Sequence, residues 1–315
     1  MKVIKGVANI REEGPKVVTI GTYDGVHRGH RKVLGAVKRR AREAGVKSCV
    51  LTFAPHPGRI LYPRKELMML SSLDHRLRLL AEEEMDITVI IGFTKGFASL
   101  SPGAFFKNIL TDGLNAREIF VGGNFMFGKG KSGGIAELRD YGRYHNIEVH
   151  AVKPLESGGK VISSTLIRNL IVRGDLSAAR RLLGRRVSVL GTVVAGVGRG
   201  KGLGFPTANL DPHNEAIPPS GVYVAGARLN GRHYGGVLNI GSRPTFFGSG
   251  KKPRKVIEVH IFDFNGRLYG EDMEVVFFKK IREEKRFAGE AELVKRIKKD
   301  AALAKNYLLG ARELF

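Results

Sequence analysis

Two kinds of segment alternate along residues 16 to 152 of the chain. Short apolar runs are mostly continuous rather than alternating with polar residues, which is typical of strands covered on both faces. We therefore predict five strands in this region. They are "KVVTIG" (16–21), "VKSCVLTF" (46–53), "DITVIIGF" (86–93), "EIFVGG" (118–123) and "IEVHAV" (147–152).

Segments with helical spacing separate these runs. In the third, Ser101 is placed to cap a helix and Pro102 to occupy its first position. Strand and helix in alternation predict a doubly wound, Rossmann-like parallel sheet, in which ligands bind beyond the carboxyl ends of the strands. The three segments are "HRKVLGAVKRRAREAG" (30–45), "SSLDHRLRLLAEEEM" (71–85) and "SPGAFFKNILTDG" (101–113).

The pattern changes from about residue 187. Strand-like runs rich in Val, Ile, Tyr and Phe are separated by Gly, Asn and Pro, and "LNGR" (229–232) and "FNGR" (264–267) carry the Asn-Gly pair favoured in tight hairpins. This pattern predicts an antiparallel barrel, and the long helical pattern over 289–308 predicts a terminal helix. The helical segment 163–184 joins the halves, so we expect domains at 1–184 and 185–315. The strand-like runs are 185–196, 221–230, 232–241, 255–264 and 268–281.

Composition narrows the class of protein. No apolar stretch reaches the length of a membrane span, the N-terminus does not resemble an export signal, and the single cysteine, Cys49, lies in an apolar run. These features favour the cytoplasm and no membrane partner. The 53 Lys and Arg against 30 Asp and Glu give a formal net charge of +23, which suits anionic ligands. Because the basic residues are scattered and Trp is absent, we expect no nucleic acid partner, and no motif indicates an oligomeric state.

The stretch "GTYDGVHRGH" (21–30) follows the first predicted strand. Gly21 and Gly25 allow a tight turn, and the free amides at a helix N-terminus can hold phosphate. His27 and His30 would lie on one side of the first helical turn, where each ring can donate a hydrogen bond to phosphate. The structural alternative is a glycine-rich turn that carries two surface histidines.

This stretch resembles the H-x-G-H signature of nucleotidyltransferases, in the form found in bacterial FAD synthetases. The resemblance continues in order through "FAPHP" (53–57), "VGGNFMFGKGKSG" (121–133) and "ISSTLIR" (162–168). It implies adenylyl transfer from ATP to FMN, giving FAD and pyrophosphate. Tyr23 stands where phenylalanine is common, and Ala54 where an acidic residue is frequent.

The resemblance implies roles for individual residues. His27 and His30 would bind the ATP phosphates and stabilise the transition state. Ser164 and Thr165 precede an apolar helical run, so the sequence itself predicts them as helix N-caps. An ordinary capped helix and an Asp24 that bonds its own turn are the structural alternatives. The other phosphate contacts would come from Gly21, Tyr23, Asp24, Gly25, Ser164, Thr165 and Arg168. The flavin contacts would come from Pro55, His56, Pro57 and Asn124.

A second glycine-rich stretch, "AGVGRGKGLGFPTANL" (195–210), opens the second half. It fails the Walker A pattern, because residue 195 is Ala and Lys201 is followed by Gly202. Glycines in such a run still suit a backbone that wraps phosphate, and the phosphate contacts we expect are Gly198, Lys201 and Gly202. A flexible hairpin is the structural alternative.

The second half resembles the riboflavin kinase domain, a small Greek-key barrel. The resemblance is carried by "GFPTAN" (204–209), by residues 221–226, 236–246 and 258–270, and by "IREEKRF" (281–287). The resemblance implies that Thr207 and Asn209, on a turn, hold Mg²⁺ and phosphate. It also implies that Glu258 accepts the proton of the riboflavin hydroxyl. Arg282 and Arg286 are candidates for phosphate or flavin contacts, and His260 is interpreted as structural.

Together the resemblances predict a bifunctional enzyme with riboflavin, FMN, FAD and ATP as ligands and Mg²⁺ as cofactor. One alternative is a nucleotidyltransferase of another specificity, such as cytidylyl or pantetheine-phosphate adenylyl transfer, which would leave "GFPTAN" and Glu258 unexplained. The other is a catalytically silent flavin- or RNA-binding regulator, against which the presence of His27, His30 and Glu258 argues.

Overall fold

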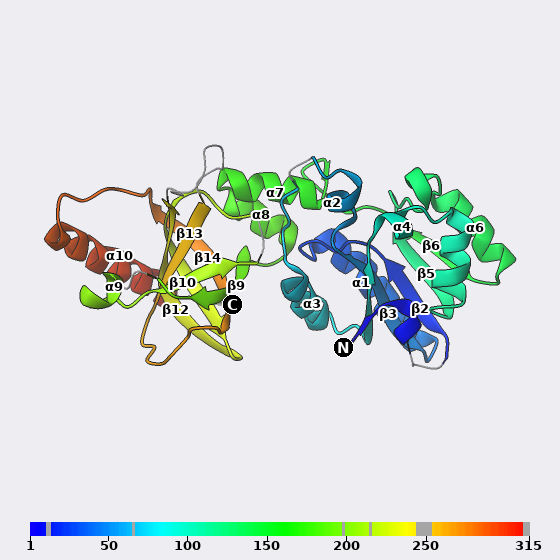
Figure 1. Ribbon diagram of the computed structural model, residues 1–315, viewed down its shortest axis with the longest axis horizontal. Helices are drawn as coiled ribbons and strands as arrows, with labels where there is room; N and C mark the ends of the chain where they lie inside the picture. Colours follow the sequence, from blue (N-terminus) through cyan, green and yellow to red (C-terminus); the bar gives the residue numbers. More distant parts are fainter. Residues whose placement is uncertain (11–13, 65–66, 197–198, 214–215, 244–253, 311–315) are drawn as a thin grey trace. The chain divides into compact units, whose positions relative to one another are not determined.

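The computed structural model describes residues 1–10, 14–64, 67–196, 199–213, 216–243 and 254–310 (Figure 1). Contacts divide the chain into two compact units. The first unit comprises Met1–Leu67 and Leu73–Ser164, and the second comprises Met68–Ser72 and Thr165–Phe315. Within the described ranges, no helix combines the length and the apolar content that a membrane span requires.

The first unit is built on a six-stranded parallel sheet with the strand order β1-β4-β3-β2-β5-β6. All five predicted strands are present, and the predicted parallel fold is confirmed. The strands are β1 (Lys2–Lys5), β2 (Lys16–Ile20), β3 (Lys47–Ala54), β4 (Ile87–Gly92), β5 (Ala116–Gly122) and β6 (Glu148–Val152).

Helices cover both faces of this sheet, as the continuous apolar strands require. Alternate residues of β2 supply two separate cores: Val18 and Ile20 pack with α5 and the following π-helical turn, whereas Val17 packs with α1 and α3. Ser101 caps α5 and Pro102 is its first residue, as predicted. The helices are α1 (Arg28–Glu43), α2 (Pro57–Leu61), α3 (Leu73–Glu82), α4 (Lys95–Ala98), α5 (Pro102–Phe105) and α6 (Ile135–Tyr144), with helical turns η1 (Val7–Asn9), η2 (Phe106–Thr111) and η3 (Lys129–Lys131).

Strand β1 was not predicted. It is only four residues long, and its burial pattern shows one buried position, Ile4, between exposed neighbours. Such a short run has no clear periodicity in the sequence, so its pairing with the edge of β4 decides its structure.

The order of strands creates a switch point. From β2 the chain proceeds to β3 and β4 on one side and then returns to β5 and β6 on the other. In sheets of this kind the crevice beyond the carboxyl ends of the two central strands is where ligands bind. Here the segments after β2 and β5 contain the predicted residues His27 and Asn124.

A buried ion-pair network stabilises the opposite end of β5. The carboxylate of Glu118 is 3% exposed and accepts bonds from Nε of Arg40 at 2.8 and 2.9 Å, while Nε2 of His150 lies 3.3 Å away. Burial by itself raises the pKa of Glu118, but the bonds and charges of Arg40 and His150 outweigh it, so its pKa lies below the ordinary value.

This network predicts that the stability of the first unit depends on pH. A carboxylate with a lowered pKa in the fold contributes stability above its unfolded pKa of about 4.3, and the contribution disappears as pH falls through the folded pKa. Glu118→Gln should therefore lower the free energy of unfolding of this unit by about 1–2 kcal/mol at pH 7 and by much less at pH 3.5. Amide hydrogen exchange of peptides from β5 and β6 measures this. Glu148→Gln, at a 65% exposed carboxylate of the same cluster, is the matched control and should change little; equal effects at both pH values would contradict the explanation.

The second unit is a closed six-stranded antiparallel barrel in the order β10-β13-β12-β11-β14-β9, followed by the terminal helix, as predicted (Figure 1). Inside the barrel lie side chains such as Leu238, Ile257 and Val259, while Val224, Val276 and Phe278 pack outward against α10. The strands are β9 (Ser188–Val194), β10 (Ala208–Pro212), β11 (Gly221–Leu229), β12 (Arg232–Arg243), β13 (Arg254–Ile261) and β14 (Asp272–Arg282), with a separate pair β7 (Glu156–Ser157) and β8 (Lys160–Val161) in the first unit. The helices are α7 (Ser164–Arg173), α8 (Leu176–Leu183), α9 (Arg199–Gly202) and α10 (Glu290–Gly310).

Two local predictions in this half are wrong. "FNGR" (264–267) does not form a tight hairpin, because it lies in the connection from β13 to β14, and these strands are not neighbours in the barrel. "LNGR" does form one, with Leu229 paired to Arg232. The segment that we expected to be a turn, from Ala208 onward, is strand β10, because it pairs with both β9 and β13 and thereby closes the barrel.

Candidate active sites

The turn between β2 and α1 brings the two predicted histidines together. His27 is the residue that caps α1: its Nδ1 accepts the backbone N–H of His30 at 3.3 Å. The two rings stack, with centroids 3.6 Å apart and an angle of 16° between their planes. Since Nδ1 of His27 acts as an acceptor, the hydrogen of the neutral ring is on Nε2, which is therefore the donor atom of this ring.

Three residues of this turn have a positive φ. Gly25 has a φ of 77°, in the left-handed region, as the sequence suggested. Tyr23 (φ 49°) and Val26 (φ 36°) share this region although neither is glycine, and a β-branched residue there is unusual. Such residues cluster at ligand sites, where the surrounding packing maintains them.

Most of the two histidine side chains lies out of bulk water: His27 is buried and His30 is half-buried. His27 is 5% exposed, and Nδ1 of His30 is buried, with no hydrogen-bond partner among the described residues. The pKa of His30 is held well below its ordinary value, first by loss of solvent and then by the charges of His27 and Arg76. The ring of His30 is therefore neutral at pH 7 and keeps one N–H donor and one acceptor.

The later helix α7 begins at Ser164, so Ser164 and Thr165 are its first residues and not N-caps, contrary to our prediction. The hydroxyl of Ser164 donates instead to the carbonyl oxygen of Asp24 at 2.9 Å, which ties it to the strained turn. Asp24 itself is 1% exposed. Arg168 is buried one turn into the helix, where its Nη1 donates to Oγ1 of Thr165 at 3.5 Å.

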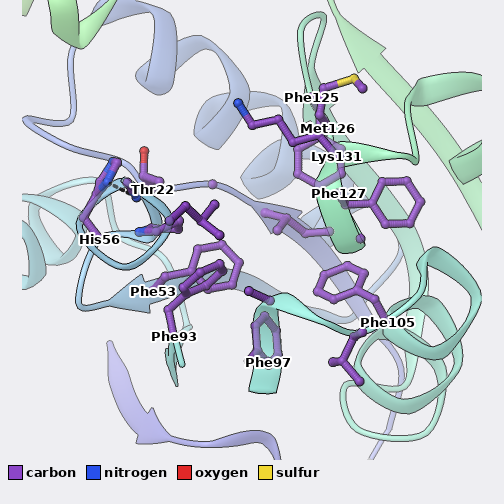
Figure 2. Close-up of a pocket in the computed structure, with 18 of the residues that line it drawn as sticks. Thr22, Phe53, His56, Phe93, Phe97, Phe105, Phe125, Met126, Phe127 and Lys131 are labelled. Atoms are coloured by element: carbon purple, nitrogen blue, oxygen red, sulfur yellow. Dashed lines mark hydrogen bonds between the residues drawn. The ribbon is translucent and has the colours of Figure 1, made fainter. Parts of the chain in front are cut away.

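A pocket of about 690 Å³ opens beside this turn (Figure 2). Gly21 and Thr22 line it at one side, and the predicted residues His56, Pro57 and Asn124 line it as well, whereas Pro55 does not. His56 caps α2, with its Nδ1 accepting the N–H of Gly58 at 3.0 Å, so this loop is the start of a helix. The walls are aromatic: Phe53, Phe93, Phe97, Phe105, Phe125 and Phe127.

In the second unit the register of the barrel places Asn209 of β10 directly opposite Glu258 of β13, and Glu258 directly opposite Asn239 of β12. Side chains of directly paired residues lie on the same face, with Cβ atoms about 5 Å apart. Their neighbours Ile257 and Val259 fill the barrel, so these polar side chains are on its outer face. Oδ1 of Asn209 is buried and has no hydrogen-bond partner in the described part of the chain.

Two glycines of the glycine-rich stretch, Gly196 and Gly200, lie close to Asn209 and Thr207. A side chain at Gly196 would collide with the amide of Asn209, and a β-carbon at Gly200 would lie 3.0 Å from Oγ1 of Thr207. Thr207 is exposed, as is Gly202, at the end of α9. Of our predicted phosphate contacts, Gly198 and the side chain of Lys201 lie outside the described residues.

Three further predictions in this unit concern His260, Arg282 and Arg286. Nδ1 of His260 donates to the carbonyl oxygen of Pro206 at 2.8 Å and so fastens "GFPTAN" to β13, which agrees with a structural role. Nε of Arg282 donates to the buried carboxylate of Asp300 at 2.8 Å, so its guanidinium anchors α10. Arg286 is exposed in the following segment.

Comparison with known proteins identifies the family. The family model described as FAD synthetase matches residues 9–166, and the one described as riboflavin kinase matches residues 183–308. The chain is 38% identical over 97% of its length to a bifunctional riboflavin kinase/FMN adenylyltransferase of Pseudomonas fluorescens, of which the match covers 97%. It is 37% identical to the enzyme of the same name from Bacillus subtilis, with 96% of each chain covered.

The chain belongs to the bifunctional riboflavin kinase/FMN adenylyltransferase family.

A solved structure with a similar fold also matches almost the whole chain. The chain resembles the crystal structure of a protein from Streptococcus pneumoniae that is named a macrolide-efflux protein, with a TM-score of 0.84 and 31% identity. The match covers 97% of this chain and 99% of that one. The efflux name belongs to that protein alone; what it shares with this bifunctional family member is the architecture of both units.

Sequence reasoning missed one charged residue of the adenylyltransferase region. Arg76 of α3 is 3% exposed, and its guanidinium donates to the carbonyl oxygen of Thr22 at 2.5 Å and to that of Phe53 at 2.9 Å. It thus links the turn after β2 to the end of β3, and both acceptor residues line the pocket. The amphipathic spacing of α3 gave no sign that one of its arginines points inward.

Proposed function

We propose that the first unit transfers the adenylyl group of ATP to FMN, giving FAD and pyrophosphate, and that the second phosphorylates riboflavin to FMN. The observation that supports this most is that each family region contains its own polar site. The first has two stacked histidines at a helix start beside an aromatic pocket, and the second has a carboxylate opposite a buried asparagine. The product of the second site is the substrate of the first.

In adenylyl transfer, a phosphate oxygen of FMN attacks the α-phosphorus of ATP, and the bond from that phosphorus to the β-bridging oxygen breaks. Negative charge builds on the α-phosphate and on the leaving pyrophosphate, so preorganised donors stabilise the transition state. Nε2 of His27 and the ring of His30 supply such donors at the start of α1. No protein nucleophile is needed.

The aromatic pocket suits the planar ring system of FMN. Phenylalanine rings offer a large apolar contact area, and His56 and Asn124 add polar groups that can orient the edge of the ring. The turn between β2 and α1, which carries His27 and His30, is called the histidine turn below. Gly21 and Thr22 begin this turn and also line the pocket, so a ring held between the phenylalanines can direct its phosphate chain toward the two histidines.

In the kinase step, the 5′-hydroxyl oxygen of riboflavin attacks the γ-phosphorus of ATP, ADP leaves, and Glu258 accepts the hydroxyl proton. A carboxylate can act as this general base when it is fixed within hydrogen-bond reach of the hydroxyl. The strand pairing of Glu258 holds it beside Asn209, the residue that we assign to metal and phosphate.

The family chemistry requires ATP and a divalent metal, and we propose Mg²⁺. The residues fit: Oδ1 of Asn209 is a buried hard oxygen with no partner in the described ranges, and the exposed hydroxyl of Thr207 is close by in the sequence. When bound, the ion neutralises charge on the phosphate oxygens of ATP. Asn209 and Thr207 would hold it, and Gly196 and Gly200 leave room for the backbone to approach.

This assignment predicts a metal effect confined to one step. Asn209→Leu, which keeps the branched shape of the side chain but removes its oxygen, should raise the magnesium concentration for half-maximal FMN formation by about tenfold or more. The magnesium dependence of FAD formation from supplied FMN should stay the same. Titrating magnesium in both assays tests this; a parallel change in the two steps would argue against a kinase-specific metal ligand.

The alternatives explain less of the chain. A cytidylyl or pantetheine-phosphate adenylyl transferase accounts for the histidine turn but not for the riboflavin kinase match over 183–308. A silent regulator would have no need of a capped and stacked histidine pair. We also propose the domain limits 1–184 and 185–315, because "ISSTLIR" belongs to the first set of motifs, and a cytoplasmic location.

The proposal is tested by incubating the chain with riboflavin, ATP and Mg²⁺ and separating the flavins by chromatography. FMN followed by FAD is the expected result. FMN alone would indicate a silent first site, and neither flavin would favour a binding protein.

A further inference from the structure

We propose that Lys131 selects phosphorylated over unphosphorylated flavin at the adenylyltransferase site. This inference rests on the proposed function, because it assigns the pocket in the first unit to FMN.

The pocket is nearly free of formal charge. Among the described residues that line it, Lys131 is the only Lys, Arg, Asp or Glu; the others are apolar, aromatic or neutral polar, apart from His56. A flavin ring needs no cation for its apolar contacts. The phosphate of FMN carries close to two negative charges at pH 7, and an ammonium is the group that distinguishes it from a hydroxyl.

The loop that carries Lys131 is held in a defined conformation. Phe127 and Gly133 exchange two backbone hydrogen bonds, at 2.9 and 3.0 Å, and the N–H of Lys129 donates to the carbonyl oxygen of Leu100 at 2.7 Å. Gly128 approaches Pro102 so closely that a β-carbon there would lie 2.7 Å from the proline ring. The loop thus presents Lys131 from a fixed base.

Lys131 itself has a φ of 60°, in the left-handed region. A residue with a β-carbon is disfavoured there, and glycine would fit the same conformation without this cost. Gly128 and Gly130 of the same loop already use positive φ values. A lysine at such a position, on the rim of a ligand pocket, is consistent with a function for its amine.

The amine points toward the side of the pocket where phosphate is expected. Figure 2 shows Lys131 on the opposite side of the pocket from Phe53, Phe93 and Phe97, with its nitrogen directed, in this view, toward the side where Thr22 lies. Thr22 belongs to the histidine turn. A flavin ring among the phenylalanines would therefore place its phosphate chain between the turn and this amine.

Selection is needed because the chain uses two flavins that share one ring system. Riboflavin is the substrate of the kinase step, and apolar contacts bind its ring as well as that of FMN. Discrimination requires an interaction that one ligand makes and the other does not. Without it, riboflavin would occupy the pocket unproductively and inhibit FAD formation.

The test compares Lys131→Met with Lys131→Arg and with Lys129→Met, a matched control in the same loop that does not line the pocket. FAD formation from supplied FMN gives the KM for FMN and for ATP. Lumiflavin, which has the ring but no phosphate and no hydroxyl for the kinase to use, gives an inhibition constant for the ring alone.

We expect Lys131→Met to raise the KM for FMN by about tenfold, the size of one charge-assisted hydrogen bond at an exposed site. The lumiflavin constant and the KM for ATP should change by less than about twofold, and Lys131→Arg and Lys129→Met should behave like the unchanged chain.

Three results would overturn the proposal. An equal rise in the lumiflavin constant would mean that the pocket as a whole is damaged, and a rise in the KM for ATP alone would assign the amine to the nucleotide. An unchanged KM for FMN would show that the charge plays no part. If the protein without any substitution makes no FAD from FMN, that result would instead overturn the proposed function, and this inference with it.

Discussion

Glu258→Gln is expected to lower FMN formation by roughly a hundredfold to ten-thousandfold, the range that a general base contributes. The amide has the shape of the carboxylate but cannot accept the hydroxyl proton of riboflavin. Glu258 is on the outer face of the barrel, directly opposite Asn209, and a neutral side chain of equal size should fold normally there. The rate of FMN formation from riboflavin and ATP measures the effect.

The other activity of the same chain serves as the internal control for this variant. FAD formation from supplied FMN should be unchanged, because it uses the first unit. Glu271→Gln, which removes an exposed carboxylate immediately before β14, should leave both steps unchanged. Retention of FMN formation in Glu258→Gln would remove Glu258 from the mechanism.

His30→Ala is expected to lower FAD formation by about a hundredfold to a thousandfold, as loss of one preorganised donor does in other transition states. The ring of His30 stacks on His27 and is neutral at pH 7, because its pKa is depressed, so it acts as a hydrogen-bond donor rather than as a charge. FMN formation should be unaffected. The two rates are measured separately, with FMN and with riboflavin as the flavin supplied.

A second substitution separates loss of the donor from loss of packing. His30→Gln keeps an N–H group near the position of the ring, so it should retain more FAD formation than His30→Ala. Equal loss in both variants, with a lower thermal stability of the first unit, would assign His30 to packing alone.

Much of the fold follows from local patterns. The strands β2 to β5 consist mainly of continuous apolar runs because helices cover both faces of the sheet, and "LNGR" forms a hairpin because its strands are neighbours. β1 has too few residues for a periodic pattern, and β10 contains Asn209, Asp211 and Pro212, which are residue types common in turns; pairing with distant strands decides the structure of both. "FNGR" contains the same dipeptide as "LNGR", but the topology of the barrel separates its flanking strands.

The candidate sites could be predicted from the sequence where their polar side chains lie within one short stretch. His27 and His30 are three residues apart at a helix start, so the sequence could place them side by side, and the N-cap bond from the N–H of His30 to His27 accompanies the stacking of their rings. The contacts of Arg76 with Thr22 and Phe53 join segments 54 and 23 residues apart, and no local pattern marks them. The same holds for the pairing of Glu258 with Asn209, which depends on the register of two strands far apart in the sequence.

The central claim is that one chain holds two separate sites for consecutive steps, and a mixing experiment tests it most directly. Supplied with riboflavin, ATP and Mg²⁺, Glu258→Gln should make very little FMN or FAD and His30→Ala should accumulate FMN, whereas a mixture of the two variants should produce FAD. If Glu258→Gln also failed to make FAD from supplied FMN, if His30→Ala also failed to make FMN from riboflavin, or if the mixture produced no FAD, the assignment of these two residues to separate sites would be wrong.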